Sequence, residues 1–242
     1  MEFHWPVGDE YERTEFGELP GAWIAATKYA QRYDATGKWA IHTGLDLNLN
    51  MPRFDADAHS PVYAAENGVV EFAGKLPVWG SVIILKHTSE SLSELWTRYA
   101  HVEQMRVGVG NLVERGRQIA QVGNADGRYP YHLHYDIARK DLGATPGDWP
   151  GDKLAAVLRD YRDPLAFMRD QLARASGFKR TRVLITAQPN LRVRQDPIIT
   201  GPVIGRIDYG EVVELVAIEN GFGRIETPKR GWIMLSWTKP AS

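Results

Sequence analysis

The stretch Pro130–Ile137, PYHLHYDI, places His132 and His134 two residues apart among β-branched and aromatic residues. This composition predicts a β-strand, in which residues i and i+2 project from the same face roughly 6.6 Å apart. Both imidazoles would then reach one small volume, while Leu133 and Tyr135 would point the other way, into a core. Taken alone, the pair is equally compatible with one buried and one surface histidine that share no role.

The composition bounds the class of protein. The chain has 242 residues, 43% of them hydrophobic, which is enough for a buried core in one or two domains. A formal net charge of -1 gives no electrostatic case for binding nucleic acid or an anionic membrane surface. No apolar run approaches a membrane span, and the start, MEFHWPVGDEYER, lacks a signal-peptide pattern. Either export is non-standard, or a leader is missing from this chain.

The chain contains no cysteine, which excludes disulfides, thiolate nucleophiles and Cys-based zinc sites. Any metal site must therefore use His, Asp or Glu, and the seven histidines are the first candidates. The absence of cysteine fits an exported bacterial protein as well as a cytosolic one.

From about Ile41 to Ile137, short strand-like runs separated by turn residues predict a predominantly antiparallel sheet. The runs are LDLNL, PVYAAENGVVEFAG, GSVIILKH, LWTRYAHV, GRQIAQVGN and YHLHYDIA.

Helical periodicity appears only later in the chain. A short helix is expected over Asp152–Tyr161, and Asp163 followed by Pro164 reads as the N-cap and first turn of a second helix that stops at Gly177. Beyond a basic linker, Lys179–Arg182, short strands resume and predict a separate small β-barrel.

A second histidine and acid cluster lies in IHTGLDL, residues 41–47. In a fully extended chain His42 and Asp46 would be about 13 Å apart, too far to share one ion with ligand bonds near 2 Å. The backbone must bend between them, and Gly44 supplies a place to bend because glycine adopts dihedrals that other residues avoid. The alternating leucines that follow would anchor a strand whose polar face begins at Asp46.

A third element is His101, which ends the apolar run RYAHV just before a polar turn. Taken alone, the HxxxD motif or the single histidine is more often a structural feature than part of a functional site. Together they lie in separate strand-like segments of one β region, where a sheet can bring side chains of the same face together.

The sequence resembles the lysostaphin/LytM-type zinc peptidases that cut peptidoglycan peptides. The resemblance rests on an ordered set of motifs: His42 and Asp46, then PVYAAENGVVEFAG, TRYAHV, VERGRQIAQVGNADG and HLHYDI. The resemblance implies a mainly β fold, with an antiparallel-sheet metallopeptidase domain over residues 1–177. Its core would span about 38–140, and short helices would follow at about 152–176. It also implies that His42, Asp46 and His134 hold zinc and that His101 and His132 are unligated catalytic histidines.

The chemistry of zinc agrees with that allocation. Three protein ligands leave a fourth position for water, whose pKa the ion lowers to about 7. His132 would act as the general base or orient the water, and His101 would stabilise the oxyanion or protonate the leaving amine. Both assignments of the proton transfer stay open at this stage.

The C-terminal segment, residues 182–240, resembles bacterial SH3-like domains through LRVR, PVIG, YGEVVEL and GWI. The resemblance implies a small barrel that binds cell-wall peptide. Aromatic residues would line its groove: Tyr209, Phe222, Trp232 and Trp237. The alternatives are that these aromatic residues fill the core and that the module binds nothing.

Some positions depart from the family pattern. The segment NLNMPRFDADAH, residues 48–59, is longer than usual and adds Asp55, Asp57 and His59 as a conceivable second metal site, although a solvated loop is the simpler interpretation. NADGRYPY replaces the usual small residues before HLH, so that rim of the groove would differ. Tyr33 is the nearest candidate for a tyrosine that helps hold the oxyanion. The remaining histidines, His4 and His87, are expected to be structural or exposed.

The family resemblance implies a zinc-dependent endopeptidase that hydrolyses amide bonds in peptidoglycan peptides, outside the cell or in the cell wall or periplasm. The main alternative is a non-catalytic or autoinhibited wall-binding or regulatory protein on the same fold. A cupin-type oxygenase is disfavoured because no histidine follows His134. The scissile bond, a host or phage origin and the oligomeric state stay open.

Overall fold

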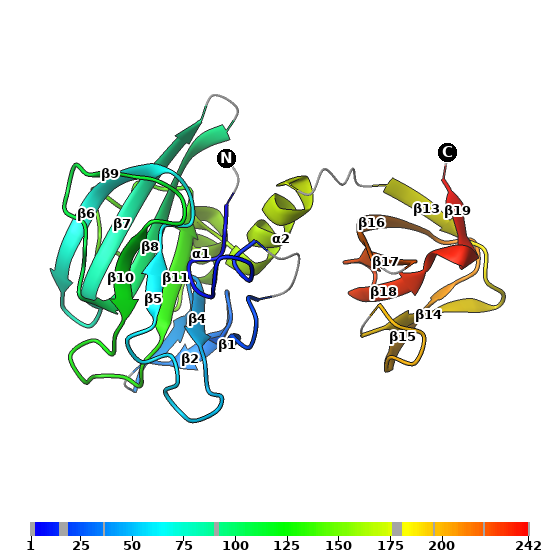
Figure 1. Cartoon of the computed structure of the whole chain (residues 1–242), viewed down its shortest axis with the longest axis horizontal. Helices are drawn as coiled ribbons and strands as arrows, with labels where there is room; N and C mark the ends of the chain where they lie inside the picture. Colours follow the sequence, from blue (N-terminus) through cyan, green and yellow to red (C-terminus); the bar gives the residue numbers. More distant parts are fainter. Residues whose placement is uncertain are drawn as a thin grey trace. The chain divides into compact units, whose positions relative to one another are not determined.

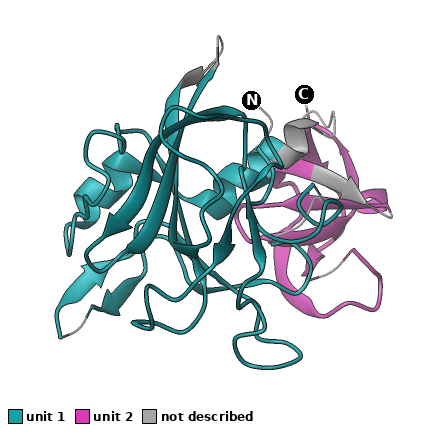
Figure 2. Cartoon of the chain, turned by 60° about the vertical axis from the view of Figure 1, so that its left-hand side comes forward, with its two compact units in different colours: residues 1–172 teal, residues 173–242 magenta. Residues whose placement is uncertain are grey.

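The structure is a computed structural model that describes residues 3–14, 19–35, 37–89, 92–175, 181–195, 197–219 and 221–241. Contacts divide the chain into two compact units, Met1–Leu172 and Ala173–Ser242 (Figure 2). The expected helix stop at Gly177 and the first half of the expected linker, Lys179–Arg182, lie outside the described residues.

The first unit is built mainly from strands (Figure 1). They are β1 (Ile24–Thr27), β2 (Arg32–Asp34), β3 (Trp39–Ile41), β4 (Leu45–Asn48), β5 (Pro61–Tyr63), β6 (Gly68–Leu76), β7 (Gly80–Ser89), β8 (Leu92–Glu103), β9 (Leu112–Val113), β10 (Gln118–Val122), β11 (Leu133–Ala138) and β12 (Tyr161–Arg162).

The main sheet has the order β1-β4-β11-β8-β7-β6-β9, with β10 pairing β5 and β8, and β12 pairing β11. Strands β2 and β3 form a separate small sheet. All these pairs are antiparallel, which confirms the predicted sheet type. Strand β11 lies between β4 and β8, so PYHLHYDI enters the middle of the sheet (Figure 1).

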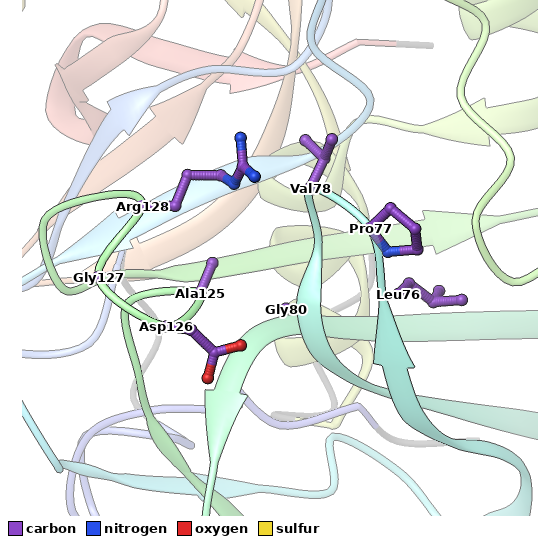
Figure 3. Close-up of a pocket in the computed structure, with 8 residues that line it drawn as sticks. All are labelled: Leu76, Pro77, Val78, Gly80, Ala125, Asp126, Gly127 and Arg128. Atoms are coloured by element: carbon purple, nitrogen blue, oxygen red, sulfur yellow. The ribbon is translucent and has the colours of Figure 1, made fainter.

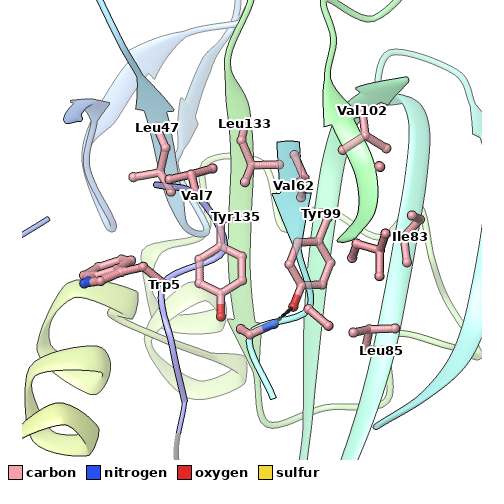
Figure 4. Close-up of a cluster of buried hydrophobic side chains, with 14 of the residues drawn as sticks. Trp5, Val7, Leu47, Val62, Ile83, Leu85, Tyr99, Val102, Leu133 and Tyr135 are labelled. Carbon is pink, nitrogen blue, oxygen red and sulfur yellow. Dashed lines mark hydrogen bonds between the residues drawn. The ribbon is translucent and has the colours of Figure 1, made fainter. Parts of the chain in front are cut away.

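One face of the sheet carries the larger core (Figure 4). Leu133 and Tyr135 of β11 are fully buried there, as the alternation predicted. The Tyr99 hydroxyl accepts a 2.9 Å hydrogen bond from the Ala65 amide, so this phenol is satisfied inside the core. Trp5, from the N-terminal segment, is also fully buried in this cluster.

The other face of the sheet is buried as well. On β7, Ile83 and Leu85 belong to the larger core, whereas Val82 and Ile84 belong to a second cluster with Tyr161. A strand that is apolar on both faces reads as a continuous apolar run, as in GSVIILKH. The even-numbered side chains of β11 therefore share their face of the sheet with this second cluster.

The helices follow the sheet in the chain. They are α1 (Leu154–Asp160) and α2 (Pro164–Ala175), close to the expected positions. The Asp163 carboxylate accepts a 2.9 Å hydrogen bond from the Leu165 amide, which confirms the predicted N-cap. Among the described residues, no helix is both long and apolar enough to cross a membrane.

The second unit is an antiparallel sheet with the order β15-β14-β18-β17-β16-β13-β19. Its elements are β13 (Thr181–Ile185), β14 (Asn190–Arg194), β15 (Val203–Asp208), β16 (Val212–Glu219), β17 (Phe222–Ile225), β18 (Gly231–Met234), the 3-10 helix η1 (Leu235–Trp237) and β19 (Thr238–Pro240). Its core includes Val193, Ile225 and Ile233, all fully buried.

Candidate metal centre

The backbone bends between His42 and Asp46, as the spacing required. His42 directly follows β3, and Asp46 is the second residue of β4. The prediction that Gly44 adopts a dihedral other residues avoid is wrong, because its φ is not in the left-handed region. A Cβ on Gly44 would lie 2.1 Å from the Tyr135 carbonyl oxygen, so the close approach of β11, and not a special dihedral, requires glycine.

His101 occupies a bulge in β8. Ala100 pairs with Val82 and Val102 pairs with Ser81, so His101 is an extra residue with a left-handed φ of 63°. A bulge re-aims a side chain that regular alternation would point elsewhere. Its ring lies against His132, with centroids 4.7 Å apart.

The register of three strands brings the remaining groups together. His134 on β11 pairs with Asp46 on β4 and with Ala100 on β8. His134 Nδ1 lies 3.0 Å from Asp46 Oδ1 and 3.0 Å from His42 Nε2. His42 Nε2 also lies 3.0 Å from Asp46 Oδ1, so these three atoms form a near-equilateral triangle.

This triangle has the donor set of a divalent metal site. Among the described residues, His42, Asp46 and His134 are the group whose ligand atoms all lie within 4.8 Å of one another. Two ligand bonds of about 2 Å to one ion reach atoms up to about 4 Å apart, which includes these separations. Converging lone pairs at such distances repel one another unless a cation lies between them, so the residues fit a metal ion.

Groups behind the triangle orient its lone pairs. His42 Nδ1 lies 3.3 Å from the Lys28 carbonyl and donates to it, which leaves Nε2 unprotonated toward the triangle. His134 Nε2 lies 3.1 Å from Asp136 Oδ1, a contact too bent for a well-formed hydrogen bond but close enough to hold the proton on Nε2. Asp136 is fully buried and accepts a 2.6 Å hydrogen bond from Nε of Arg98, which is also fully buried.

The electrostatics of the triangle follow from these contacts. Burial alone would raise the pKa of Asp46, but the His42 and His134 imidazoles hold that pKa well below its usual value. Burial alone would lower the pKa of His134, but the Asp136 and Asp46 carboxylates raise that pKa to about 9. The raised pKa means that His134 binds a proton at neutral pH, and this proton balances the negative charge of the two carboxylates.

The two histidines outside the triangle have their rings fixed by carbonyl groups. His101 Nδ1 donates to the Trp79 carbonyl over 2.9 Å, and His132 Nδ1 donates to the Pro130 carbonyl over 2.8 Å. His132 Nε2 therefore carries the lone pair, 3.8 Å from Asp46 Oδ1. Burial lowers the pKa of both imidazoles, so both are neutral bases.

All five predicted site residues line one cleft of about 350 Å³. Tyr33 also lines it, with its ring 5.6 Å from that of His42 and perpendicular to it, so this candidate lies at the site despite its sequence spacing. Trp79 and Tyr129 complete the walls around His101.

Sequence reasoning missed Asp136 and Arg98. Both lie within quoted motifs, HLHYDI and TRYAHV, and Asp136 pairs with Arg98 in the register of β11 and β8. The available signal was the i, i+2, i+4 alternation, which puts His132, His134 and Asp136 on one face of the strand.

The three residues considered as a second metal site, Asp55, Asp57 and His59, do not converge on one point. Asp55, Asp57 and His59 are described, and they are not part of any group of converging ligand atoms within the described ranges. Asp57 is fully buried, whereas the His59 ring pairs with Glu103 at the surface. Of the two remaining histidines, His4 and His87, the second is fully buried, as a structural histidine would be.

The His42–Asp46–His134 group could hold a metal ion, and two further histidines with lowered pKa values lie beside it in the same open cleft. Residues 40–146 match Peptidase family M23, and the chain therefore carries a domain of this family. This match includes all the predicted ligands and both further histidines.

Two similar proteins carry the names of peptidases. The chain is 30% identical over 148 residues to peptidoglycan DD-endopeptidase ShyB of Vibrio cholerae, covering 60% of this chain and 30% of that protein. It is 31% identical over 98 residues to DD-carboxypeptidase/endopeptidase Mpg of Neisseria meningitidis, covering 40% of this chain and 20% of that protein. The chain thus spans less than a third of these relatives' length. Lysostaphin from Staphylococcus simulans superposes with a TM-score of 0.46 at 16% identity, over 97% of this chain and 92% of that one.

Proposed function

We propose that the protein is a zinc-dependent endopeptidase that hydrolyses amide bonds in peptidoglycan peptides outside the cell or in the periplasm. The observation that carries this proposal is the triangle of His42, Asp46 and His134 at 3.0 Å separations, open to a cleft that also holds His101 and His132. The names of the relatives support the class of substrate.

His42, Asp46 and His134 would hold the zinc ion. When bound, zinc supplies a water of lowered pKa, about 7, and polarises the scissile carbonyl. Asp136 would keep the proton of His134 on Nε2, so that Nδ1 would be available to hold the ion.

The unligated histidines would move the protons. His132 Nε2 is unprotonated and lies next to the ligand group, so it is placed to accept a proton from the attacking water. The His101 ring lies 4.7 Å from that of His132, between centroids, and His101 is suited to return a proton to the leaving amine. Tyr33 is suited to donate to the developing oxyanion from beside His42.

The experiment measures release of new amino termini from purified peptidoglycan sacculi, with chelator and after restoring zinc. His134→Ala is expected to lose zinc and activity, whereas His132→Ala is expected to retain zinc and lose turnover. His59→Gln changes an exposed histidine outside the triangle and serves as the matched control. Bound zinc without release from several wall chemistries would favour the non-catalytic alternative.

We also propose that the second unit, as an SH3-like module, binds cell-wall peptide. A hollow of about 310 Å³ in this unit is lined by Trp237, Ile199 and Arg192, and Trp237 is 52% exposed. Phe222 and Trp232 are buried, so the expectation that they line a groove is wrong. Trp237→Ala is expected to weaken sedimentation of the full chain with sacculi, and Tyr209→Ala, which changes an exposed aromatic outside this hollow, is the control.

A further inference from the structure

A second hollow adjoins the catalytic cleft. It measures about 430 Å³ and lies between the β6–β7 connection and the loop before β11 (Figure 3). Its walls are residues 76–80, without Trp79, and residues 125–128. Val78 lines both this hollow and the cleft that holds the triangle, so a peptide lying across Val78 would occupy both.

The walls of this hollow are held in unusual backbone conformations. Val78 has a φ of 71°, an outlier for a β-branched residue, and is 49% exposed. Ala125 and Asp126 follow each other with φ values of 53° and 58°. Strained residues persist only where the surrounding structure holds them, and they concentrate at binding sites.

Local contacts fix the loop against the sheet. The Gly127 amide donates a 2.8 Å hydrogen bond to the Asn124 side chain. Gly80 lies so close to Ala125 that a Cβ on Gly80 would be 2.7 Å from the Ala125 Cα. The hollow is therefore preformed, which lowers the entropic cost of binding a ligand there.

The uncompensated charge of the hollow is positive. The Asp126 carboxylate is neutralised by Lys75, 2.8 Å away. Arg128 is exposed, and its guanidinium has no hydrogen-bond or ion-pair partner within the part of the chain that the structure describes. Figure 3 shows Arg128 extending toward Val78, while the Asp126 carboxylate points away from it. A guanidinium matches the planar, bidentate geometry of a carboxylate.

We propose that this hollow is a substrate subsite in which Arg128 binds a carboxylate of the peptide, so that the enzyme prefers peptides with a free carboxylate next to the cleaved region. The proposal rests on the proposed endopeptidase function. The substrate class is an acidic cross-linked peptide, and the amidated form of the same peptide is the poorer substrate.

The test uses the full chain with zinc and synthetic cross-linked peptides whose side carboxylates are either free or amidated. Arg128→Gln is expected to raise KM about tenfold for the acidic peptide with kcat little changed, and to leave the amidated peptide unaffected. Arg117→Gln is the matched control, because Arg117 is exposed and lines a hollow that shares no residue with the cleft. Equal KM values for Arg128→Gln and Arg117→Gln on the acidic peptide overturn the subsite.

A binding measurement separates this result from failure of the proposed function. Calorimetry with the same peptides is done on His132→Ala, with and without Arg128→Gln. If the wild type cleaves neither peptide but the acidic peptide binds about tenfold more weakly without Arg128, the subsite stands and the endopeptidase function fails. If both peptides are cleaved and bound equally with or without Arg128, the endopeptidase function stands and the subsite fails.

Discussion

At the residue scale, Asp136 links His134, a proposed metal ligand, to the interior of the sheet. Its carboxylate contacts His134 on one side and Arg98 on the other, and the three side chains are almost completely buried. Arg98 in turn stacks on Trp79, 4.0 Å from the ring centroid, and Trp79 offers its carbonyl to His101. A proposed ligand, His134, and a proposed proton donor, His101, are thus oriented through one buried ion pair.

Asp136→Asn is expected to lower zinc affinity about 10- to 100-fold, because the His134 tautomer loses the carboxylate that holds it. The same change leaves Arg98 buried without a counter-charge, which is expected to cost about 3–5 kcal/mol of unfolding free energy. Competition with a chelator and denaturant unfolding measure the two effects. Asp152→Asn, at an exposed carboxylate, should change neither. Wild-type zinc affinity in Asp136→Asn would show that Asp136 does not orient the ligand.

His87, which lies outside the proposed metal site, is expected to make the stability of the fold depend on pH. Burial lowers its pKa to about 4, and its ring nitrogens contact the Asn67 carbonyl and the Thr97 hydroxyl, each at 2.8 Å. Since the unfolded chain binds a proton near pH 6.5 and the folded chain only near pH 4, stability is full above 6.5 and is lost as pH falls between these values. This residue should account for about 2 kcal/mol between pH 7.5 and pH 5.

The measurement compares urea unfolding at these two pH values for the wild type, His87→Gln and the exposed-site control His59→Gln. The variant at His87 is expected to lose less stability on acidification than the other two proteins. Equal losses in all three would mean that His87 is not the group that titrates.

At the element scale, the register of β4, β11 and β8 sets the site. Asp46 pairs with His134, and Asp136 pairs with Arg98, so the proposed ligands and the groups behind them occupy successive positions on one face. Opposite-charge pairs across strands stabilise such a register, and a slip by one residue would turn every side chain to the other face. The bulge at His101 then turns that side chain into the cleft.

Gly44→Ala is expected to disrupt this arrangement, because its Cβ would lie 2.1 Å from the Tyr135 carbonyl and 2.6 Å from Asp136 Oδ1. Strand β4 would have to move away from β11, with a loss of about 1–3 kcal/mol of stability and of zinc binding. Gly108→Ala, where a Cβ meets nothing within 4 Å, is the matched control. Thermal unfolding and zinc titration of both variants test this, and normal zinc binding by Gly44→Ala would contradict it.

At the scale of the whole molecule, the proposed catalysis and the proposed wall binding lie in different units. The triangle, the cleft and the proposed subsite all lie within Met1–Leu172, and the hollow that contains Trp237 lies within Ala173–Ser242. Each unit has its own buried cluster, as a domain requires.

Removal of zinc is therefore expected to destabilise the first unit selectively. Free zinc at 100 times its dissociation constant stabilises the folded state by about 2.7 kcal/mol, and a chelator removes that amount. Hydrogen exchange followed by mass spectrometry should show faster exchange around β4 and β11 after chelation, and unchanged exchange in β13–β19. Equal acceleration in both units, or no change in the first, would contradict a zinc site made of these ligands.

Much of the site was predictable from sequence, because alternation within a strand is a local property. It placed Leu133 and Tyr135 in the core, it put His132 and His134 on the other face, and the lack of cysteine restricted the ligands to His, Asp and Glu. The need for a bend between His42 and Asp46 followed from chain dimensions alone.

Only the tertiary structure decided which of these groups meet. His42 and His134 are 92 residues apart in sequence, and their contact depends on how separate strands align, which local periodicity does not encode. The same holds for the Arg98–Asp136 pair, for Tyr33 beside His42, and for the meeting of Val78 and Arg128 around one hollow. The physical reason is that periodicity determines the face a side chain occupies, whereas packing of the whole sheet determines the neighbour it finds there.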